Sequence, residues 1–456
     1  MGLRQVDSQE TTMTLQLPAD SRILNTDFVF GVATSSFQIE GGLDSRLPCI
    51  WDTFCATPGA IRDGSHGAVA CDHIRLWRED VQLIQSLGVD AYRLSLSWPR
   101  VMQQNGELNP TGVAFYRDLL GALKAQGIRT FVTLYHWDLP QYLEDQGGWR
   151  NRDTAYAFAD YADKISTALA DLVDAWATLN EPFCSSYLGY EIGVHAPGLK
   201  NKGWGRQSAH HLLLAHGLAM PKLRQNAPQA QHGIVLNFTP CYAETDAPAD
   251  IAAADLADQY FNQWYIKPLF DKAYPACIST LADDEKPQIQ PGDFDIIAAP
   301  LDYLGINFYT RHVYRADAAA GFVVVDQPDA PKTDIGWEIY PQAFTDLLLD
   351  LHRRYPLPPL YIMENGAAGA DELVAGKVQD DMRLGYYQQH LLALDNAIRQ
   401  GVDVRGYFAW SLMDNFEWAE GYLKRFGIVY VDYATQQRVI KQSGLAFRDL
   451  SLSRKG

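Results

Sequence analysis

The sequence lacks an apolar run long enough to cross a membrane, and its first 20 residues contain no continuous apolar core of a secretory signal. Basic side chains are also few, because 38 lysines and arginines face 55 acidic residues and give a formal charge of -17. Such a charge repels phosphate backbones and anionic lipid surfaces. We therefore expect a cytoplasmic protein without nucleic-acid or membrane partners. Its oligomeric state stays open.

Cysteine and histidine form no recognisable metal-binding pattern. The six cysteines show neither a C-x-x-C pair nor a zinc spacing, which favours reduced thiols. His210, His211 and His216 lack the i, i+4 spacing that places two imidazoles on one helical face, so a packed helix is favoured there. We expect no metal and no cofactor. Cys184, three residues after Glu181, is the cysteine expected nearest to a site, although a small buried hydrophobe is its favoured interpretation.

What the chain does contain is a series of strand-like segments. Eight short runs are rich in Val, Ile, Leu or aromatic residues and are nearly continuous in apolar character, which is typical of strands buried on both faces. Hydrophobic residues make up 47% of the chain, enough for a large core. The runs cover residues 28–36, 91–98, 129–137, 175–182, 232–240, 302–310, 360–366 and 404–415.

Helical patterns separate these runs. Residues 115–127 place a tyrosine and three leucines at i, i+3, i+4 and i+7, and residues 341–355 open with proline and end in basic residues. Strands alternating with helices, without a linker, predict an α/β fold with a single (β/α)8 TIM barrel over residues 25–456. A doubly wound open sheet would usually carry a G-x-G-x-x-G turn, which "FGVATSSFQIEGG" is not. Residues 1–24 stay unassigned, and a disordered lead-in is one interpretation.

Polar and aromatic residues gather where the predicted strands end. In a TIM barrel these ends meet at one mouth, which carries the active site. Carboxylates and amides bind sugar hydroxyls, and flat aromatic rings cover the apolar face of a pyranose, so the collection suits a sugar. The residues are Gln38, Arg93, His136, Trp137, Asn180, Glu181, Asn237, Asn307, Tyr309, Glu364, Asn365, Trp410 and Glu417.

Two glutamates stand out within this set. "TLNEP" ends the fourth predicted strand with Glu181, and "IMENG" ends the seventh with Glu364. Strands four and seven of a closed barrel face one another across the mouth. A pair of carboxylates at a sugar site suggests cleavage of a glycosidic bond, with one as proton donor and the other as nucleophile or base. A retaining mechanism requires them to lie about 5–5.5 Å apart.

From residue 27 to residue 447 the chain resembles the β-glucosidases of glycoside hydrolase family 1. "FGVATSSFQIEGG", "TLNEP", "IMENG" and "SLMDNFEWAEGYLKRFGIVYVD" look like the family's N-terminal signature, acid/base motif, nucleophile motif and sugar-clamp segment, in the right order. The resemblance implies a retaining β-glucosidase with Glu181 as acid/base and Glu364 as nucleophile. It also implies that the glycon is held by Gln38, His136, Trp137, Asn180, Trp410, Glu417 and Trp418.

Supporting roles follow from charge and hydrogen bonding. Arg93, by resemblance a neighbour of the nucleophile, and the Tyr309 hydroxyl are expected to keep Glu364 ionised. Glu181 faces that negative charge, so its pKa should rise and it should stay protonated. Asn180 is expected to bond the sugar 2-hydroxyl. Two aromatic residues have less specific expectations: Trp337 as an aglycone platform, and Phe426 either as glycon-pocket lining or as packing.

The departures from the family pattern are mild. Phe30 and Phe37 stand where Trp and Tyr are usual, and Met363 stands where Thr is commoner. Because strand neighbours point to opposite faces, Met363 should point away from Glu364 toward the helical layer.

Small β-glucosides or cello-oligosaccharides are the expected substrates, in carbohydrate metabolism and cellulose degradation. Gluco, galacto and fuco preference stay open. A 6-phospho-β-glucosidase is one alternative, although Glu417 would repel the phosphate. A transglycosylase would share every residue named. A catalytically silent sugar-binding barrel would not need both glutamates, and a metal-dependent hydrolase would show clustered His and Asp ligands at the strand ends.

Overall fold

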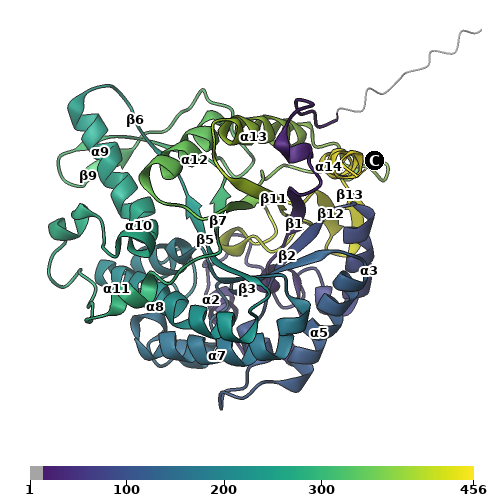
Figure 1. The fold of residues 1–456 in the computed structure, drawn as a ribbon, viewed down its shortest axis with the longest axis horizontal. Coiled ribbons are helices and arrows are strands. Elements are labelled where there is room, and N and C mark those ends of the chain that lie inside the picture. The colour runs from purple at the N-terminus through teal and green to yellow at the C-terminus, as the bar shows by residue number, and fades with distance from the viewer. Residues whose placement is uncertain (1–13, 456) are drawn as a thin grey trace, which may run out of the picture.

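Eight parallel strands close into a barrel in the computed structural model, which describes residues 14–455 (Figure 1). The hydrogen-bonded order is β1-β11-β10-β7-β5-β4-β3-β2, and the barrel closes because β1 pairs with both β11 and β2. Each strand lies within one of the eight predicted runs or overlaps it, so the predicted TIM barrel is confirmed. The strands are β1 (Val29–Ala33), β2 (Ala91–Ser95), β3 (Arg129–Tyr135), β4 (Ala175–Asn180), β5 (Gln231–Phe238), β7 (Tyr303–Phe308), β10 (Leu360–Asn365) and β11 (Val404–Trp410).

Helices surround the barrel on all sides of the view in Figure 1. The longer ones are α3 (His73–Ser86), α5 (Pro110–Ala125), α7 (Asp153–Leu169), α8 (Lys202–Asn226), α9 (Pro248–Asp258), α10 (Trp264–Asp271), α12 (Gln342–Arg354), α13 (Asp381–Arg399) and α14 (Gln442–Ser453). The short ones are α1 (Ser36–Ile39), α2 (Ile50–Ala56), α4 (Trp98–Val101), α6 (Gln141–Glu144) and α11 (Asp293–Ile297). Within residues 14–455, no helix has both the length and the apolar character that a membrane span requires.

Helix α5 illustrates how local sequence sets these elements. It begins after Asn109, whose side chain accepts a hydrogen bond from the Thr111 backbone N–H, and Pro110 occupies the first helical position. The predicted apolar stripe, from Tyr116 to Leu123, is buried. Gly127 follows the helix with a φ of 72°, a conformation that glycine adopts at no steric cost.

Smaller elements lie outside the barrel. One three-stranded sheet joins β6 (Cys241–Ala243), β8 (His312–Asp317) and β9 (Gly321–Val324), and one hairpin joins β12 (Val429–Asp432) to β13 (Gln437–Ile440). Two π-helical segments are η5 (Cys184–Glu191) and η6 (Gln259–Gln263). The 3-10 segments are η1 (Arg22–Leu24), η2 (Leu43–Ser45), η3 (Gly148–Arg150), η4 (Ala170–Leu172), η7 (Ala276–Thr280) and η8 (Trp418–Glu420).

Inside the barrel, the Phe131 side chain of β3 meets side chains from β10 and β11, which are not neighbours of β3. The Phe131 ring lies 5.4 Å from the Tyr361 ring and 4.9 Å from the Phe408 ring, centroid to centroid. Met363 belongs to this same buried cluster, so the prediction that it points to the helical layer is wrong. Simple alternation fails because the register of β10 shifts between Ile362 and Glu364, which lets both Met363 and Glu364 face inward.

The N-terminal segment corrects another expectation. A disordered lead-in was one interpretation of residues 1–24, but residues 14–24 lie beside α13, where Figure 1 draws them in purple. The Ser21 hydroxyl donates to Asp395 at 2.5 Å, and Ile23 is fully buried. Residues 1–13 lie outside the described residues.

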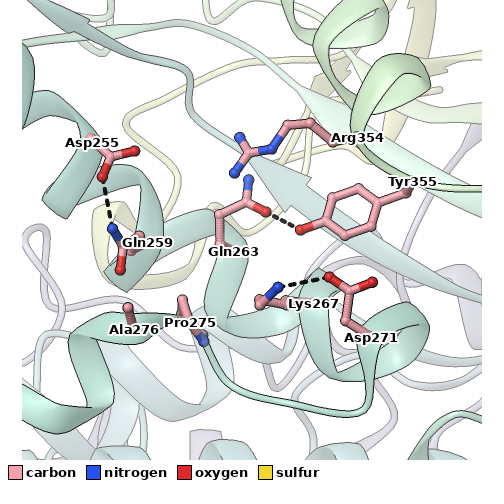
Figure 2. Close-up of a pocket in the computed structure, with 9 residues that line it drawn as sticks. All are labelled: Asp255, Gln259, Gln263, Lys267, Asp271, Pro275, Ala276, Arg354 and Tyr355. Atoms are coloured by element: carbon pink, nitrogen blue, oxygen red, sulfur yellow. Dashed lines mark hydrogen bonds and ion pairs between the residues drawn. The ribbon is translucent and has the colours of Figure 1, made fainter.

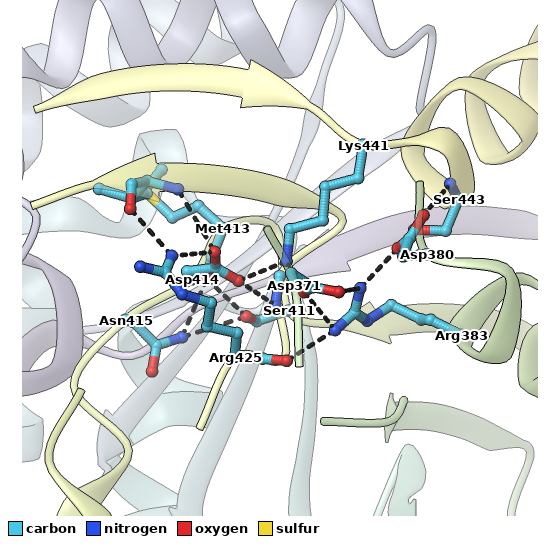
Figure 3. A network of polar contacts seen from close by, with 12 residues as sticks. Asp371, Asp380, Arg383, Ser411, Met413, Asp414, Asn415, Arg425, Lys441 and Ser443 are labelled. Carbon is cyan, nitrogen blue, oxygen red and sulfur yellow. Dashed lines mark hydrogen bonds and ion pairs between the residues drawn. The ribbon is translucent and has the colours of Figure 1, made fainter. Parts of the chain in front are cut away.

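A buried network of charges ties together the loops that follow β10 and β11 (Figure 3). Lys441 Nζ lies 2.5 Å from Asp371 Oδ2 and 2.6 Å from Asp414 Oδ1. Asp371 also pairs with Arg383 at the start of α13, and Asp414 pairs with Arg425. Because the chain from Asp414 to Arg425 carries Glu417 and Trp418, the network holds part of the predicted site in place.

Replacing Lys441 by Met should destabilise the protein by about 3–5 kcal/mol, because two buried carboxylates lose their shared counter-charge. The measurement is urea-induced unfolding followed by circular dichroism. Lys267→Met is the matched control, since the Lys267–Asp271 pair is partly exposed and should contribute less than about 1 kcal/mol. Equal midpoints for the Lys441 variant and the parent protein would show that the network does not stabilise the fold.

Candidate active site

A cavity of about 710 Å³ opens at the C-terminal ends of the barrel strands. The structure brings most of the predicted site residues to its wall. They include His136, Trp137, Glu181, Asn237, Asn307, Tyr309, Trp337, Glu364, Trp410, Glu417, Trp418 and Phe426. Arg93, Asn180 and Gln38 are buried and are not part of that wall.

Glu364 is held by two donors from other strands. Arg93 Nη1 lies 2.7 Å from Glu364 Oε1, and the Tyr309 hydroxyl donates to Oε2 at 2.6 Å. Burial and the nearby Glu364 carboxylate hold the pKa of Tyr309 well above its usual value, so this hydroxyl keeps its proton. A positive charge and a hydrogen bond therefore both reach this carboxyl group, and these are the two contacts that the sequence led us to expect.

Glu181 has a different environment. Asn307 Nδ2 donates to its Oε1 at 2.6 Å, and the Cys184 thiol donates to its Oε2 at 3.0 Å. Burial, followed by the charge of Glu364, raises the pKa of Glu181 to about 7. The sequence predicted this direction from the neighbouring charge alone, but burial is the larger cause.

A chain of hydrogen bonds connects the two glutamates. Asn180 Oδ1 accepts from Arg93 Nη2 at 2.6 Å and from Asn307 Nδ2 at 3.0 Å. Arg93 then reaches Glu364, and Asn307 reaches Glu181. Each carboxyl group is therefore positioned by the same buried amide, which fixes one relative to the other.

Three buried polar atoms on the cavity wall have no hydrogen-bond partner among the described residues: His136 Nδ1, Asn307 Oδ1 and Glu417 Oε2. Unpaired buried groups are costly, so such a wall favours a ligand rich in hydroxyl groups. Burial, then Arg93, holds the pKa of His136 well below its usual value, so the ring is neutral. Burial, then the charges of Glu364 and Glu181, raises the pKa of Glu417 to about 8.

Aromatic rings form the rest of the inner wall. His136 stacks on Trp410 and on Trp418, with centroids 5.9 Å apart in both pairs. The ring centroids of Trp137 and Trp418 are 4.5 Å apart. Phe426 lines the cavity and also packs against Tyr309. Flat rings of this kind suit the apolar face of a sugar.

Besides Arg93 and Asn180, Gln38 and Asn365 also lie behind the wall rather than on it. The Gln38 amide donates to Asn415 Oδ1 at 3.0 Å and to the Phe416 carbonyl at 2.9 Å. Asn365 donates to the Phe308 carbonyl and to the Tyr386 hydroxyl on α13, so it faces the helical layer. Asn365 is therefore removed from the predicted rim set.

Some residues at this mouth have a strained backbone conformation. Trp137, Glu181 and Trp418 have φ values of 81°, 48° and 47°, in the left-handed region that side-chain-bearing residues rarely adopt. Each such conformation costs about 1–3 kcal/mol and persists only where the surroundings impose it. All three residues line the cavity, which supports a functional reason for their conformation.

The outer half of the cavity was missed by sequence reasoning. Its walls come from η5, η6 and the β8–β9 hairpin rather than from barrel strands. These residues are not at strand ends, so a search of the strand ends could not find them. The one signal in the sequence was that their loops follow the fourth, fifth and sixth barrel strands, whose ends lie at the mouth. The missed residues include Phe183, Tyr187, Phe261, His312, Tyr314, Phe322 and Val324.

A second hollow, of about 320 Å³, lies between η6, α10 and the end of α12 (Figure 2). It contains none of the predicted site residues. Lys267 pairs with Asp271 at 2.7 Å, and the Tyr355 hydroxyl donates to Gln263. Its polar groups therefore satisfy one another. Across residues 14–455, His, Cys, Asp and Glu side chains form no group of three or more that could hold a metal ion.

Comparison with known proteins gives the family. The model of glycosyl hydrolase family 1 matches residues 21–455. A β-glucosidase of Agrobacterium sp. is 46% identical over 92% of this chain and 93% of its own length. β-Glucosidase A of Thermotoga maritima is 41% identical over 91% of this chain and 95% of its own.

Solved structures agree with this result. The AHE enzyme of Alicyclobacillus herbarius superposes with a TM-score of 0.92 at 46% identity, covering 98% of this chain and 99% of that one. A Thermotoga maritima β-glucosidase in complex with glucoimidazole superposes with a TM-score of 0.91 at 40% identity, covering 94% and 98%. The chain belongs to glycosyl hydrolase family 1.

Proposed function

We propose that this retaining β-glucosidase acts on terminal β-D-glucosyl residues of small β-glucosides or cello-oligosaccharides, with Glu364 as nucleophile and Glu181 as acid/base. The contrast between the two carboxyl groups carries the proposal. Glu364 is paired with Arg93 and accepts from Tyr309, whereas burial and the charge of Glu364 raise the pKa of Glu181 to about 7. One group is prepared to attack and the other to donate a proton.

In the first step a Glu364 oxygen bonds to the anomeric carbon. The glycosidic bond breaks as Glu181 transfers its proton to the leaving oxygen, and the aglycone departs as an alcohol. The product is a glucosyl ester of Glu364, which no longer carries a negative charge. Glu181 therefore loses the repulsion that had raised its pKa and is more readily ionised.

In the second step water attacks the anomeric carbon. Glu181 takes a proton from that water, the ester bond breaks, and Glu364 leaves as a carboxylate stabilised again by Arg93 and Tyr309. Glucose is released with its anomeric configuration retained. A transglycosylase would use the same residues with a sugar hydroxyl in place of water, and product analysis at high acceptor concentration separates the two.

The binding roles follow from the cavity wall. His136 and Glu417 would bond glucose hydroxyls, Trp410 would lie beneath the ring, and Trp137, Trp418 and Phe426 would enclose it. The Asn180 amide is buried behind this wall and would reach the sugar 2-hydroxyl by giving up a present hydrogen bond, such as the one to His136. Gln38 lies behind the wall, so its amide would bond a sugar hydroxyl only if it gave up its hydrogen bond to Asn415 or to the Phe416 carbonyl. Trp337 contacts Phe426 at the cavity wall, a place suited to an aglycone.

Location and role are proposed from chemistry. All six cysteines are free, which suits a reducing cytoplasm. Relatives include a protein named 1,4-beta-D-glucan glucohydrolase, from Thermotoga neapolitana. These observations support a cytoplasmic role in carbohydrate metabolism that includes the degradation of cellulose fragments.

A panel of nitrophenyl β-glycosides, assayed without added metal, tests the activity and the glycon. We expect cleavage of the β-glucoside. The 6-phosphoglucoside should have a kcat/KM at least about 100-fold lower, because the Glu417 carboxyl group on the cavity wall would face the phosphate. Faster cleavage of the phosphorylated substrate would replace the proposal by the 6-phospho-β-glucosidase alternative.

The nucleophile is tested with a 2-deoxy-2-fluoroglucoside that carries a dinitrophenyl leaving group. The fluorine slows both steps, and the activated leaving group allows the covalent intermediate to accumulate. We expect one label per chain, located on Glu364 by peptide mass spectrometry, and none in Glu364→Gln. A label on any other side chain contradicts the assignment.

The acid is tested with Glu181→Ala. For a phenyl glucoside, whose leaving group needs a proton, kcat/KM should fall by about 10²–10⁴. For a dinitrophenyl glucoside, whose leaving group needs none, it should fall by less than about 10-fold. Glu107→Ala, at an exposed glutamate, is the control and should change neither value. Equal losses on both substrates would mean that Glu181 is not the acid.

A further inference from the structure

We propose that Cys184 is a positioning residue for the acid/base: its thiol donates a hydrogen bond to Glu181 Oε2 that orients the carboxyl group and favours its ionised form. This inference rests on the proposed role of Glu181. It replaces the interpretation of Cys184 as only a small buried hydrophobe.

The local fold places the thiol on its own neighbour. Glu181 leaves β4 with a left-handed backbone, and the Cys184 backbone N–H donates to the Glu181 carbonyl at 2.9 Å as η5 begins. This turn folds the Cys184 side chain back over the Glu181 side chain, with Sγ 3.0 Å from Oε2. The contact is thus built by the same strand end that carries the acid/base.

The two oxygens of Glu181 have separate donors. Asn307 serves Oε1 from β7, and within residues 14–455 the thiol is the one donor to Oε2. Two donors from different elements fix both the position and the rotation of a carboxyl group, and either alone would leave it free to turn.

A thiol is a weak donor in water, but this site strengthens it. Glu181 is 5% exposed and Cys184 8% exposed, so little water competes. The acceptor is charged once Glu181 has given up its proton, and a charge-assisted hydrogen bond is about twice as strong as a neutral one. Burial, followed by the Glu181 carboxylate, holds the pKa of the thiol well above its usual value, so it stays a donor.

The proton balance is simple. The thiol keeps its proton in both steps, and only Glu181 exchanges one with the leaving oxygen and with water. The thiol bond is stronger when Glu181 is ionised, so it opposes the burial and the Glu364 charge that raise the pKa of Glu181. The ionisable groups that face Glu181 or share its cavity are Arg93, His136, Cys184, Tyr187, His195, Tyr309, His312, Tyr314, Glu364, Glu417 and Glu420.

The test is the pH profile of kcat/KM for a phenyl glucoside, in which protonated Glu181 is the active form. Without the thiol donor the ionised form is less stable, the pKa of Glu181 rises, and the basic limb should move upward by about 0.5–1 pH unit. Cys184→Val removes the donor and fills its space, so that water cannot replace it. Cys184→Ala is the second donor-free variant.

Two variants provide the controls. Cys184→Ser keeps a donor and should leave the basic limb within about 0.3 unit of the parent protein. Cys277→Ala alters a buried cysteine in η7, outside the cavity wall, and should leave the limb unchanged. An unmoved limb in the Val and Ala variants overturns the proposal, and so does an equal shift in Cys184→Ser, which would indicate packing alone.

Titration of the ¹³C-labelled glutamate carboxyl carbons by NMR, with Glu181→Gln to assign the signal, decides the inference without turnover. We expect a higher pKa for Glu181 in Cys184→Val than in Cys184→Ser. Absence of activity on every β-glucoside would reject the proposed function, whereas identical titration curves in these two variants would reject the role of Cys184.

Discussion

The ion pair between Arg93 and Glu364 is the interaction on which the rest of the site depends. Arg93 comes from β2 and Glu364 from β10, so this 2.7 Å contact spans the barrel mouth. Both side chains are at most 5% exposed, and a buried guanidinium without a carboxylate would be very costly. The second arm of Arg93 binds Asn180, which orients Asn307 and through it Glu181. Loss of Arg93 would therefore disturb both carboxyl groups.

Burial then raises the pKa of two carboxyl groups of the mouth. Of the carboxyl groups of Glu181, Glu364 and Glu417, only that of Glu364 has an arginine partner at ion-pair distance among the described residues. Burial and mutual repulsion raise the pKa of Glu181 to about 7 and that of Glu417 to about 8. In the proposed double displacement the acid must hold a proton before the glycosidic bond breaks, and the raised pKa of Glu181 suits that role.

The site also relies on rigid surroundings. Trp137, Glu181 and Trp418 hold strained backbone conformations at the cavity wall. The segment that carries Glu417 and Trp418 lies between Asp414 and Arg425, which pair with each other at 2.6 Å, and Lys441 adds a second buried bond to Asp414 (Figure 3). Because these contacts hold the loops rigid, the unpaired polar atoms of the cavity wall stay in place for a ligand.

The sequence by itself was enough to predict the barrel and to place Glu181 and Glu364 at the ends of its strands. Apolar runs alternating with amphipathic helices specify strands buried on both faces, and strand ends specify the mouth, because both signals are local. The inward orientation of Met363, the outward orientation of Asn365 and the place of Gln38 behind the wall were decided by the tertiary structure. A register shift in β10 and hydrogen bonds to distant segments set them, and neither follows from alternation.

The outer part of the cavity and the contact between the Cys184 thiol and Glu181 were also decided by the tertiary structure. Residues on η5, η6 and the β8–β9 hairpin meet only because loops from different strands converge on one mouth. Proximity along the chain marked Cys184 as near the site, but a bond to Glu181 Oε2 depends on the turn that follows β4. Local sequence therefore determined which groups were available. Chain closure alone decided which atoms touch, because distances between side chains from separate strands are set by packing and not by their spacing in sequence.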